Sequence, residues 1–305
     1  MTQHNFRKIK SIQEFHTIRG LPSPFHPLVS LVDYSQSKIL DAYLGENWSF
    51  SFYSIGVKRN VGTIRYGQKK YDFDGGIMSF IAPGQRVSIE RNAKVNLKPS
   101  GWLLLVHPDF LWNTSLAKNI KNYDFFNYSI NEALFMSEKE EGIIEQLIQN
   151  IKLEIENNID SFSQNIIVAQ IELLLNYADR FYQRQFITRK KINHEILDRL
   201  EELLSELFTN EVLKAQGVPT VQQIADKLNL SPNYLSSLLK SLTGQNTQQH
   251  IHGKLIEKAK EKLSTTTLSV NEIAFELGFE HSQSFSKLFK SKTDLSPSSF
   301  RASFK

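Results

Sequence analysis

Short apolar runs separated by turn residues dominate the first part of the chain. Between residues 28 and 106 the runs LVSLVDY, WSFSFYSIGV, IMSFIAPG, RVSIE and GWLLLV are punctuated by Gly75-Gly76, Pro83-Gly84 and Pro99-Ser100-Gly101. The runs are rich in aromatic and β-branched residues, which at this spacing is typical of a small antiparallel barrel or sandwich. The pattern therefore predicts an all-β N-terminal part.

After His107-Pro108 the apolar period becomes helical. Three stripes with spacings of three and four predict three amphipathic helices. The stripes are Ile144, Leu147, Ile148, Ile151 and Ile155; Ile167, Ile171, Leu174, Ala178 and Phe181; and Ile196, Leu200, Leu203, Leu204 and Leu207. Such stripes form either ordinary core or a dimer surface, and the pattern favours neither. The basic stretch 184–191 is interpreted as a hinge or as a solvated loop.

The C-terminal end contains an internal repeat. TVQQIADKLNLSPNYLSSLLKSLTG, from Thr220, aligns with SVNEIAFELGFEHSQSFSKLFKSKTD, from Ser269. Apolar positions recur 49 residues later before the turn and 50 residues later beyond it, so the second turn has one more residue. The matched positions are Val221, Ile224, Ala225, Leu228 and Leu230 with Val270, Ile273, Ala274, Leu277 and Phe279, then Leu235, Leu238, Leu239 and Lys240 with Phe285, Leu288, Phe289 and Lys290.

Each copy has the sequence features of a helix-turn-helix, over 220–242 and 269–292. Each first helix opens with a capping box, in which side chains bind backbone donors that a helix start leaves free. The boxes are Thr220 with Gln223 and Ser269 with Glu272, and Ser231-Pro232 suits the start of a second helix. One helix of roughly 17 residues, 247–263, separates the copies and spans about 25 Å. Held by it, two recognition helices reach successive major grooves, about 34 Å apart.

The exposed faces predicted for the second helices are polar and uncharged, or cationic. Such side chains suit contacts with base edges and phosphates in a major groove. They are Asn233, Ser236, Ser237 and Lys240 in the first copy and Ser282, Gln283, Ser286, Lys287 and Lys290 in the second. These nine residues are the predicted DNA-binding residues.

The net charge of +4 lies at the C-terminal end. Residues 217–305 contain 11 Lys and Arg against 7 Asp and Glu, whereas residues 1–216 contain 25 of each kind. A basic surface is either merely solvated or a docking site for a polyanion, and a charge of this size does not decide between them. Together with the repeat it favours double-stranded DNA as the partner.

The repeat resembles the AraC/XylS family of bacterial transcription regulators. The resemblance covers residues 218–305 and rests on IADKLNLSPNYLSSLLK, LIEKAKEKL and IAFELGFEHSQSFSKLFKSKTDLSPSSFR. It implies an α+β chain with a cupin-like antiparallel β-barrel over 1–115 and a helical connector with dimerisation helices over 116–214. An all-α DNA-binding domain over 215–305 then holds two helix-turn-helix units joined by a long helix. By motif position, Asn233, Ser236 and Ser237, and then Gln283, Ser286 and Lys287, face bases.

The resemblance also implies partners and a mode of action. A regulator of this family is expected to be a homodimer, to respond to a small-molecule effector in the barrel and to contact RNA polymerase, and activation is commoner than repression. Three positions depart from the family pattern. Leu255 replaces an Arg of the linking helix, which puts one DNA-backbone contact in doubt although Lys254 is adjacent, while Asp294 replaces a Gly and Leu239 a Phe without abolishing the fold.

A function of another class is the alternative: a cupin-type small-molecule-binding protein or metal-dependent enzyme with an accessory DNA-binding domain. Such enzymes need several His and carboxylate ligands at one metal. His26 and His107 of the barrel segment are far apart in sequence, and His250 and His252 lie two apart in the linking helix, where side chains face apart. We predict no catalytic residue, no metal and no cofactor.

Tyr53, Tyr66 and Trp102 lie in predicted strands, where they line a ligand pocket or form barrel core; the core interpretation is favoured, and no effector-binding residue is assigned. Cysteine is absent, which excludes disulfides and agrees with a reducing compartment. The sequence has no signal-peptide pattern and no apolar segment of roughly 20 residues. We therefore predict a cytoplasmic protein without a membrane partner.

Overall fold

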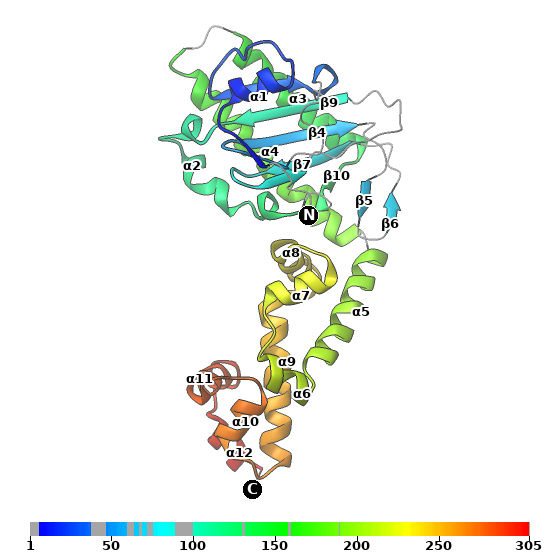
Figure 1. Ribbon diagram of the computed structural model, residues 1–305, viewed down its shortest axis with the longest axis vertical. Helices are drawn as coiled ribbons and strands as arrows, with labels where there is room; N and C mark the ends of the chain where they lie inside the picture. The colour runs from blue at the N-terminus through cyan, green and yellow to red at the C-terminus, as the bar shows by residue number, and fades with distance from the viewer. Residues whose placement is uncertain are drawn as a thin grey trace. The chain divides into compact units, whose positions relative to one another are not determined.

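The computed structural model describes residues 6–37, 47–59, 64–66, 69–71, 76–88, 100–129, 132–157, 160–188 and 190–304. The chain divides into two compact units, Met1–Gln185 (unit 1) and Phe186–Lys305 (unit 2) (Figure 1). The division falls inside the predicted helical connector, so the domain boundaries 1–115, 116–214 and 215–305 stay predictions. The coarser organisation, β-sheets first and helices after them, is confirmed.

The strands of unit 1 form two sheets and a separate hairpin. They are β1 (Phe6–Ile9), β2 (Val29–Asp33), β3 (Asn47–Phe50), β4 (Tyr53–Arg59), β5 (Ile64–Tyr66), β6 (Lys69–Tyr71), β7 (Ile77–Ile81), β8 (Arg86–Ser88), β9 (Ser100–Val106) and β10 (Leu134–Phe135). The larger sheet is antiparallel, in the order β10, β7, β4, β9, β2. In the smaller sheet, β1-β3-β8, β1 pairs with β3 in parallel. β5 and β6 make the hairpin.

One hydrophobic core of unit 1 lies between these two sheets. Because side chains alternate along a strand, Leu103 and Leu105 of β9 face the smaller sheet, where Phe50 and Phe52 pack against them. Gly56 of β4 permits this packing, since a Cβ atom there would lie 2.4 Å from Leu103 Cδ2. The space between the described strands is thus filled by the chain's own side chains. The cupin-like barrel form stays a prediction.

An N-terminal helix that the sequence analysis did not predict also belongs to this core. α1 (Ile12–Ile18) begins after Ser11, whose Oγ accepts a hydrogen bond from the backbone N–H three residues on, at 3.1 Å. Its buried face contributes Ile12, Phe15 and Ile18 to the cluster between the sheets. The first described residues are therefore structural parts of unit 1.

Helices cover the other face of the larger sheet (Figure 1). The long ones are α3 (Glu138–Glu156), which contacts β2, and α4 (Ser163–Thr188), and their buried residues match the first two predicted stripes. The short ones are η3 (Pro108–Leu111), α2 (Ser115–Asn119), η4 (Ile120–Asn122) and η5 (Asp124–Asn127). The short helix η1 (Tyr34–Gln36) follows β2, and its Tyr34 packs instead against the core between the two sheets. Phe80 of β7 meets the rings of Phe125 and Tyr182 at centroid distances of 4.3 and 6.2 Å, so this face forms a second apolar layer.

The basic stretch 184–191 is helical wherever it is described. α4 ends at Thr188 and α5 (Lys190–Leu207) begins two residues later, while residue 189 lies outside the described residues. Arg184 donates to Glu140 of α3 at 2.6 Å and to the Phe135 carbonyl at 2.9 Å. The solvated-loop alternative is therefore wrong for Arg184, because these partners hold its guanidinium.

Helices are the only regular secondary structure among the described residues of unit 2. After α5 follow α6 (Asn210–Gln216), α7 (Val221–Leu228), α8 (Pro232–Thr243), α9 (Thr247–Thr265), α10 (Val270–Glu276), α11 (Ser282–Thr293) and α12 (Pro297–Ala302). The long α9 contacts α8, α10, α11 and α12, so it forms the axis of the unit. Across the described parts of both units, we find no helix with the length and apolar character needed to cross a membrane.

Candidate nucleic-acid interface

The first helix pair, α7 and α8, begins and ends at the residues predicted from the sequence. Thr220 Oγ1 accepts from the Gln223 backbone at 3.2 Å, and Gln223 Oε1 accepts from the Thr220 backbone at 2.8 Å, which completes the capping box. Asn229 ends α7 in a left-handed conformation, with φ of 57°. Ser231 caps α8 by accepting from Tyr234 N at 3.2 Å. Short-range bonds therefore fix this turn.

The second pair, α10 and α11, repeats the first cap but not the second. Ser269 Oγ accepts from Glu272 N at 3.2 Å, and the Glu272 carboxylate accepts from Ser269 N at 2.7 Å. His281 precedes α11 and makes no side-chain capping bond to any described residue. Asp294 ends α11 with φ of 59°, where Gly244 ends α8 with φ of 76°. Asp294 thus adopts the left-handed turn that the repeat requires.

The predicted contact face of α8 is partly used inside the protein. Asn233, Ser236 and Ser237 are half-buried, and Lys240 is exposed. Ser236 Oγ lies 3.0 Å from Oγ1 of the fully buried Thr247 in α9. The Ser236 hydroxyl is therefore already hydrogen-bonded, which the sequence analysis did not anticipate. Its partner is eleven residues along the chain, outside the local pattern that defined the repeat.

The predicted contact face of α11 is more open and more cationic. Gln283, Lys287 and Lys290 are exposed, and Ser282 and Ser286 are half-buried. The opposite side of this helix is anchored in the core by buried aromatic side chains. α11 contains three lysines and no acidic residue, whereas α8 contains one lysine and no acidic residue. Of the two predicted recognition helices, α11 therefore carries the larger positive charge.

The helix between the pairs is slightly longer than predicted. α9 has 19 residues, or about 28 Å at 1.5 Å per residue. Leu255 is 2% exposed and packs in the core, so its side chain is not placed for a phosphate. Lys254 is half-buried, with Nζ 3.7 Å from Glu257 Oε2. The α9 position at which the family carries Arg is therefore a core position in this chain.

Local bonds occupy the four histidines that were considered as metal ligands. In α9, His250 Nε2 lies 2.9 Å from Thr243 Oγ1 and His252 Nε2 lies 2.8 Å from the Gln248 amide nitrogen; burial lowers the pKa of both rings. In unit 1, Nδ1 of His26 accepts from the backbone at 3.1 Å and Nδ1 of His107 does so at 3.3 Å. Within the described residues no three His, Cys, Asp or Glu side chains gather to hold a metal ion.

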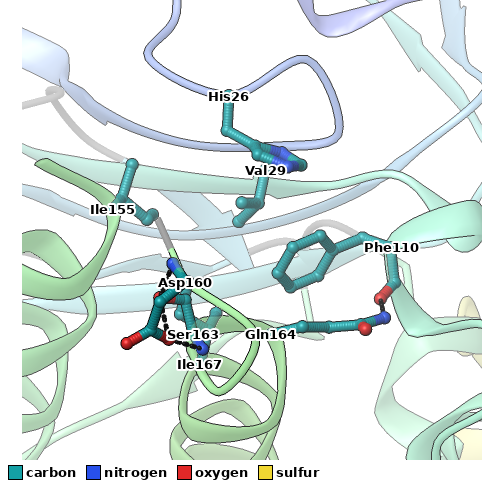
Figure 2. A pocket seen from close by; sticks show the side chains of 8 residues that line it. All are labelled: His26, Val29, Phe110, Ile155, Asp160, Ser163, Gln164 and Ile167. Carbon is teal, nitrogen blue, oxygen red and sulfur yellow. Dashed lines mark hydrogen bonds between the residues drawn. The ribbon is translucent and has the colours of Figure 1, made fainter. Parts of the chain in front are cut away.

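A small cavity of unit 1 lies on the helix-covered side of the larger sheet (Figure 2). Its volume of about 60 Å³ is far below the roughly 300–1,000 Å³ of typical ligand pockets. The lining residues are His26, Val29, Phe110, Ile155, Asp160, Ser163, Gln164 and Ile167. Asp160 caps the start of α4, with Oδ1 3.0 Å from Ser163 N, and Gln164 Nε2 donates to the Phe110 carbonyl at 2.7 Å. Most of the polar rim is therefore already hydrogen-bonded.

The three aromatic residues considered for a ligand pocket belong to the same helix-covered face or lie outside the described side chains. The Tyr53 ring packs on Phe126 at 5.1 Å, and burial raises the pKa of its phenol. Trp102 is 5% exposed, and its Nε1 has no hydrogen-bond partner among the described residues. The side chain of Tyr66 is outside the described part. Trp102 packs as a core residue, whereas Tyr53 is half-buried and packs on Phe126.

Comparison with known proteins gives matches at the C-terminal end. Residues 224–303 match the family model described as "Helix-turn-helix domain". The chain is 30% identical over 148 residues to the uncharacterized HTH-type transcriptional regulator YfiF of Bacillus subtilis, covering 48% of this chain and 43% of that protein. It is 38% identical over 84 residues to the raffinose operon transcriptional regulatory protein RafR of Pediococcus pentosaceus, covering 28% and 30%. The chain thus spans less than half the length of these curated relatives.

Among solved structures, one match is the C-terminal domain of the two-component response regulator yesN of Fusobacterium nucleatum. The identity is 32%, the match covers 34% of this chain and 95% of that one, and the TM-score is 0.31. Like the curated matches, it involves a minor share of this chain.

Proposed function

Because residues 224–303 form a helix-turn-helix domain of the AraC/XylS type, we propose that this protein is a sequence-specific DNA-binding transcription regulator. The observation that carries the proposal is the repeat in unit 2: each pair has a capped first helix and a second helix that exposes lysine and amide or hydroxyl groups. A major groove admits such a helix and offers acceptors and donors to those side chains. Two helix-turn-helix units joined by α9 then address two neighbouring grooves.

The nine predicted residues divide into two groups in this proposal. Exposed long side chains make the contacts with bases and phosphates: Lys240 of α8, and Gln283, Lys287 and Lys290 of α11. Asn233 of α8 is half-buried and therefore belongs to neither group clearly defined by exposure. Asn and Gln pair with adenine, and Lys with guanine or a phosphate. The short hydroxyls Ser236, Ser237, Ser282 and Ser286 fix the fit of each helix in its groove.

The proposed role of unit 1 is regulatory, as a cupin-like domain that responds to a small-molecule effector. The cavity of Figure 2 accommodates only a few non-hydrogen atoms, so an effector of metabolite size needs space beyond it. Screening the full chain for ligand-induced thermal stabilisation tests the effector directly. By analogy with the family we also propose RNA polymerase as a partner and activation as the outcome.

Homodimerisation through α4 is part of the same proposal. An exposed apolar stripe follows a spacing of four, three and four residues through Phe162, Ile166, Ala169 and Leu173. This spacing forms a seam along a helix, and two copies of one seam bury each other about a twofold axis. Leu173→Asp should convert a dimer into monomers in sedimentation at micromolar concentration. An unchanged mass would remove α4 from the proposed interface.

The decisive experiment is titration of the full chain against its own upstream intergenic DNA, with scrambled DNA as competitor, at two salt concentrations. We expect preference for the genuine sequence, a footprint over two adjacent major grooves, and weaker binding at higher salt because lysines displace counterions from phosphates. A full chain without binding is then compared with unit 2 alone, residues 186–305. Binding by unit 2 alone indicates inhibition by unit 1, whereas failure of both contradicts the proposed function.

A further inference from the structure

The short helix α6 packs against the turn of the second helix pair at an unusually close backbone approach. Gly278, between α10 and α11, has φ of 81°. A Cβ atom there would lie 2.8 Å from the Leu213 carbonyl oxygen and 2.9 Å from the carbonyl carbon of Gly217. A side chain at this position therefore forces the two segments apart.

Glu276 at the end of α10 adds a polar link at the same place. Its carboxylate accepts from Lys214 Nζ of α6 at 2.9 Å and from Lys262 Nζ of α9 at 2.7 Å. The lysine hydrogen bonds, that of Lys262 first, hold the pKa of Glu276 below its ordinary value. Lys262 is only 13% exposed, so its charge depends on this partner more than that of Lys214, which is 54% exposed.

These contacts give unit 2 a second connection between its helix pairs. The first connection is α9, which contacts α8 of the first pair and α10 and α11 of the second. The second runs from α7 through α5 and α6 to α10, since α5 contacts α7 and α6, and α6 contacts α10. α9 packs against both pairs and fixes part of their arrangement. The second connection adds an independent constraint on the position of the second pair.

We propose that α6, held by Glu276 and by the Gly217–Gly278 contact, is a brace that sets the distance between recognition helices α8 and α11. The protein therefore measures the spacing between its two DNA half-sites as well as their sequences. This inference rests on the proposed function. One inserted base pair moves a half-site by about 3.4 Å and rotates it by about 35°, displacements that a braced pair of helices cannot follow.

The test compares spacings on one selected sequence. The full wild-type chain selects a duplex from random DNA, and affinities are then measured for that duplex and for versions with one base pair inserted or removed between the half-sites. We expect wild type to prefer the selected spacing by about tenfold, the cost of a typical mismatch. Glu276→Gln and Lys214→Met should reduce this preference to about threefold or less, mainly by improved relative binding of the altered spacings.

Matched variants separate a brace from general stability. Lys227→Met removes another exposed lysine, on α7, and should keep the full spacing preference. Gly278→Ala forces α6 and the turn apart and should give the largest relaxation. An unchanged preference in Lys214→Met and Glu276→Gln, or an equal loss of affinity at all three spacings, overturns the brace. If Glu276→Gln does not fold, the result for the exposed Lys214 decides. Absence of DNA selection by wild type instead contradicts the proposed function.

Discussion

In the first helix pair Ser231 caps α8 and Ser236 is bonded to Thr247, whereas in the second pair His281 leaves α11 uncapped and Gln283 stays exposed. The apolar positions of the two pairs correspond almost one to one, so both copies keep the same core. They differ in how their polar side chains are used. In the first pair several serve the protein itself, and in the second more of them face solvent.

This difference suggests that the two copies contribute differently to stability and to DNA binding. Hydrogen bonds within the protein stabilise α8 on α9, but a hydroxyl that is already bonded gains little from a base. The exposed lysines of α11 attract phosphates, but they make no comparable contribution to the stability of the helix pair. We therefore expect the first pair to contribute more to the stability of unit 2 and the second more to DNA affinity.

The largest effect should come from proline at Leu235 in the first pair. Leu235 is fully buried, and its backbone N–H donates to the Ser231 carbonyl at 3.0 Å. Leu235→Pro removes the hydrogen bond and the core contact, at about 5 kcal/mol or more. Ser282→Pro is the matched control, because Ser282 has the place that Pro232 occupies in the first pair, and it should be neutral or stabilising by up to about 1 kcal/mol. Chemical denaturation of both variants checks this; a stable Leu235→Pro variant would contradict the assigned core.

The next effect concerns DNA affinity. Lys287→Ala in α11 should weaken binding to the selected DNA by about tenfold, and Lys240→Ala in α8 by less, because α8 has fewer exposed polar partners to act with it. Salt titrations distinguish the type of contact: loss of a phosphate contact lowers the salt slope by about 1. Equal losses for both variants would show that the two copies share DNA contacts evenly, against the division proposed above.

A smaller effect is expected at the start of α11. His281→Ser supplies the capping hydroxyl that Ser231 supplies to α8, and should stabilise unit 2 by about 1 kcal/mol. Ser231→Ala should destabilise it by about as much or more, since Ser231 makes further contacts. Thermal and urea unfolding of the full chain provide the readout. If His281→Ser has no effect while Ser231→Ala does, the backbone before α11 is not suited to a cap.

The smallest effect separates the two capping boxes by pH. Gln223 closes the first box and Glu272 the second, where hydrogen bonds from the Ser269 backbone and hydroxyl hold the pKa of Glu272 below its ordinary value of 4.5. A lowered carboxylate pKa stabilises the fold above pH 4.5, and this contribution disappears as pH falls through the folded-state value. Hydrogen exchange should therefore show α10 opening before α7 below pH 4.5. Glu272→Gln should weaken that order, and an unchanged order would assign the acid sensitivity to Glu276 of the same helix, whose pKa is also lowered.

The features that were predictable from sequence are those fixed by neighbours along the chain. The caps at Thr220, Ser231 and Ser269, and the three apolar stripes before them, depend on residues within a few turns, and the structure has them where expected. The family resemblance supplied what periodicity alone does not, namely a DNA-binding type for the helix-turn-helix domain that residues 224–303 match. The DNA contacts and the barrel form stay predictions.

The features that were not predictable depend on partners far along the chain. Ser236 has the same local pattern as any exposed serine, and only the position of α9 brings Thr247 to it. α6 is a helix of seven residues, too short for a periodic signal, and its role depends on Glu276, more than fifty residues away. For β1, pairing in parallel with β3 leaves no hairpin signal in the sequence.

That last feature has a consequence during synthesis on the ribosome. β1 and α1 are made well before β9, yet Ile9 and Ile12 are buried in one cluster with Leu103 and Leu105 of β9. The chain from β1 through β9 must therefore be synthesised before this cluster is complete. Until then they remain accessible to chaperones and proteases. The burial of β1 and α1 is therefore completed only when β9 has been made.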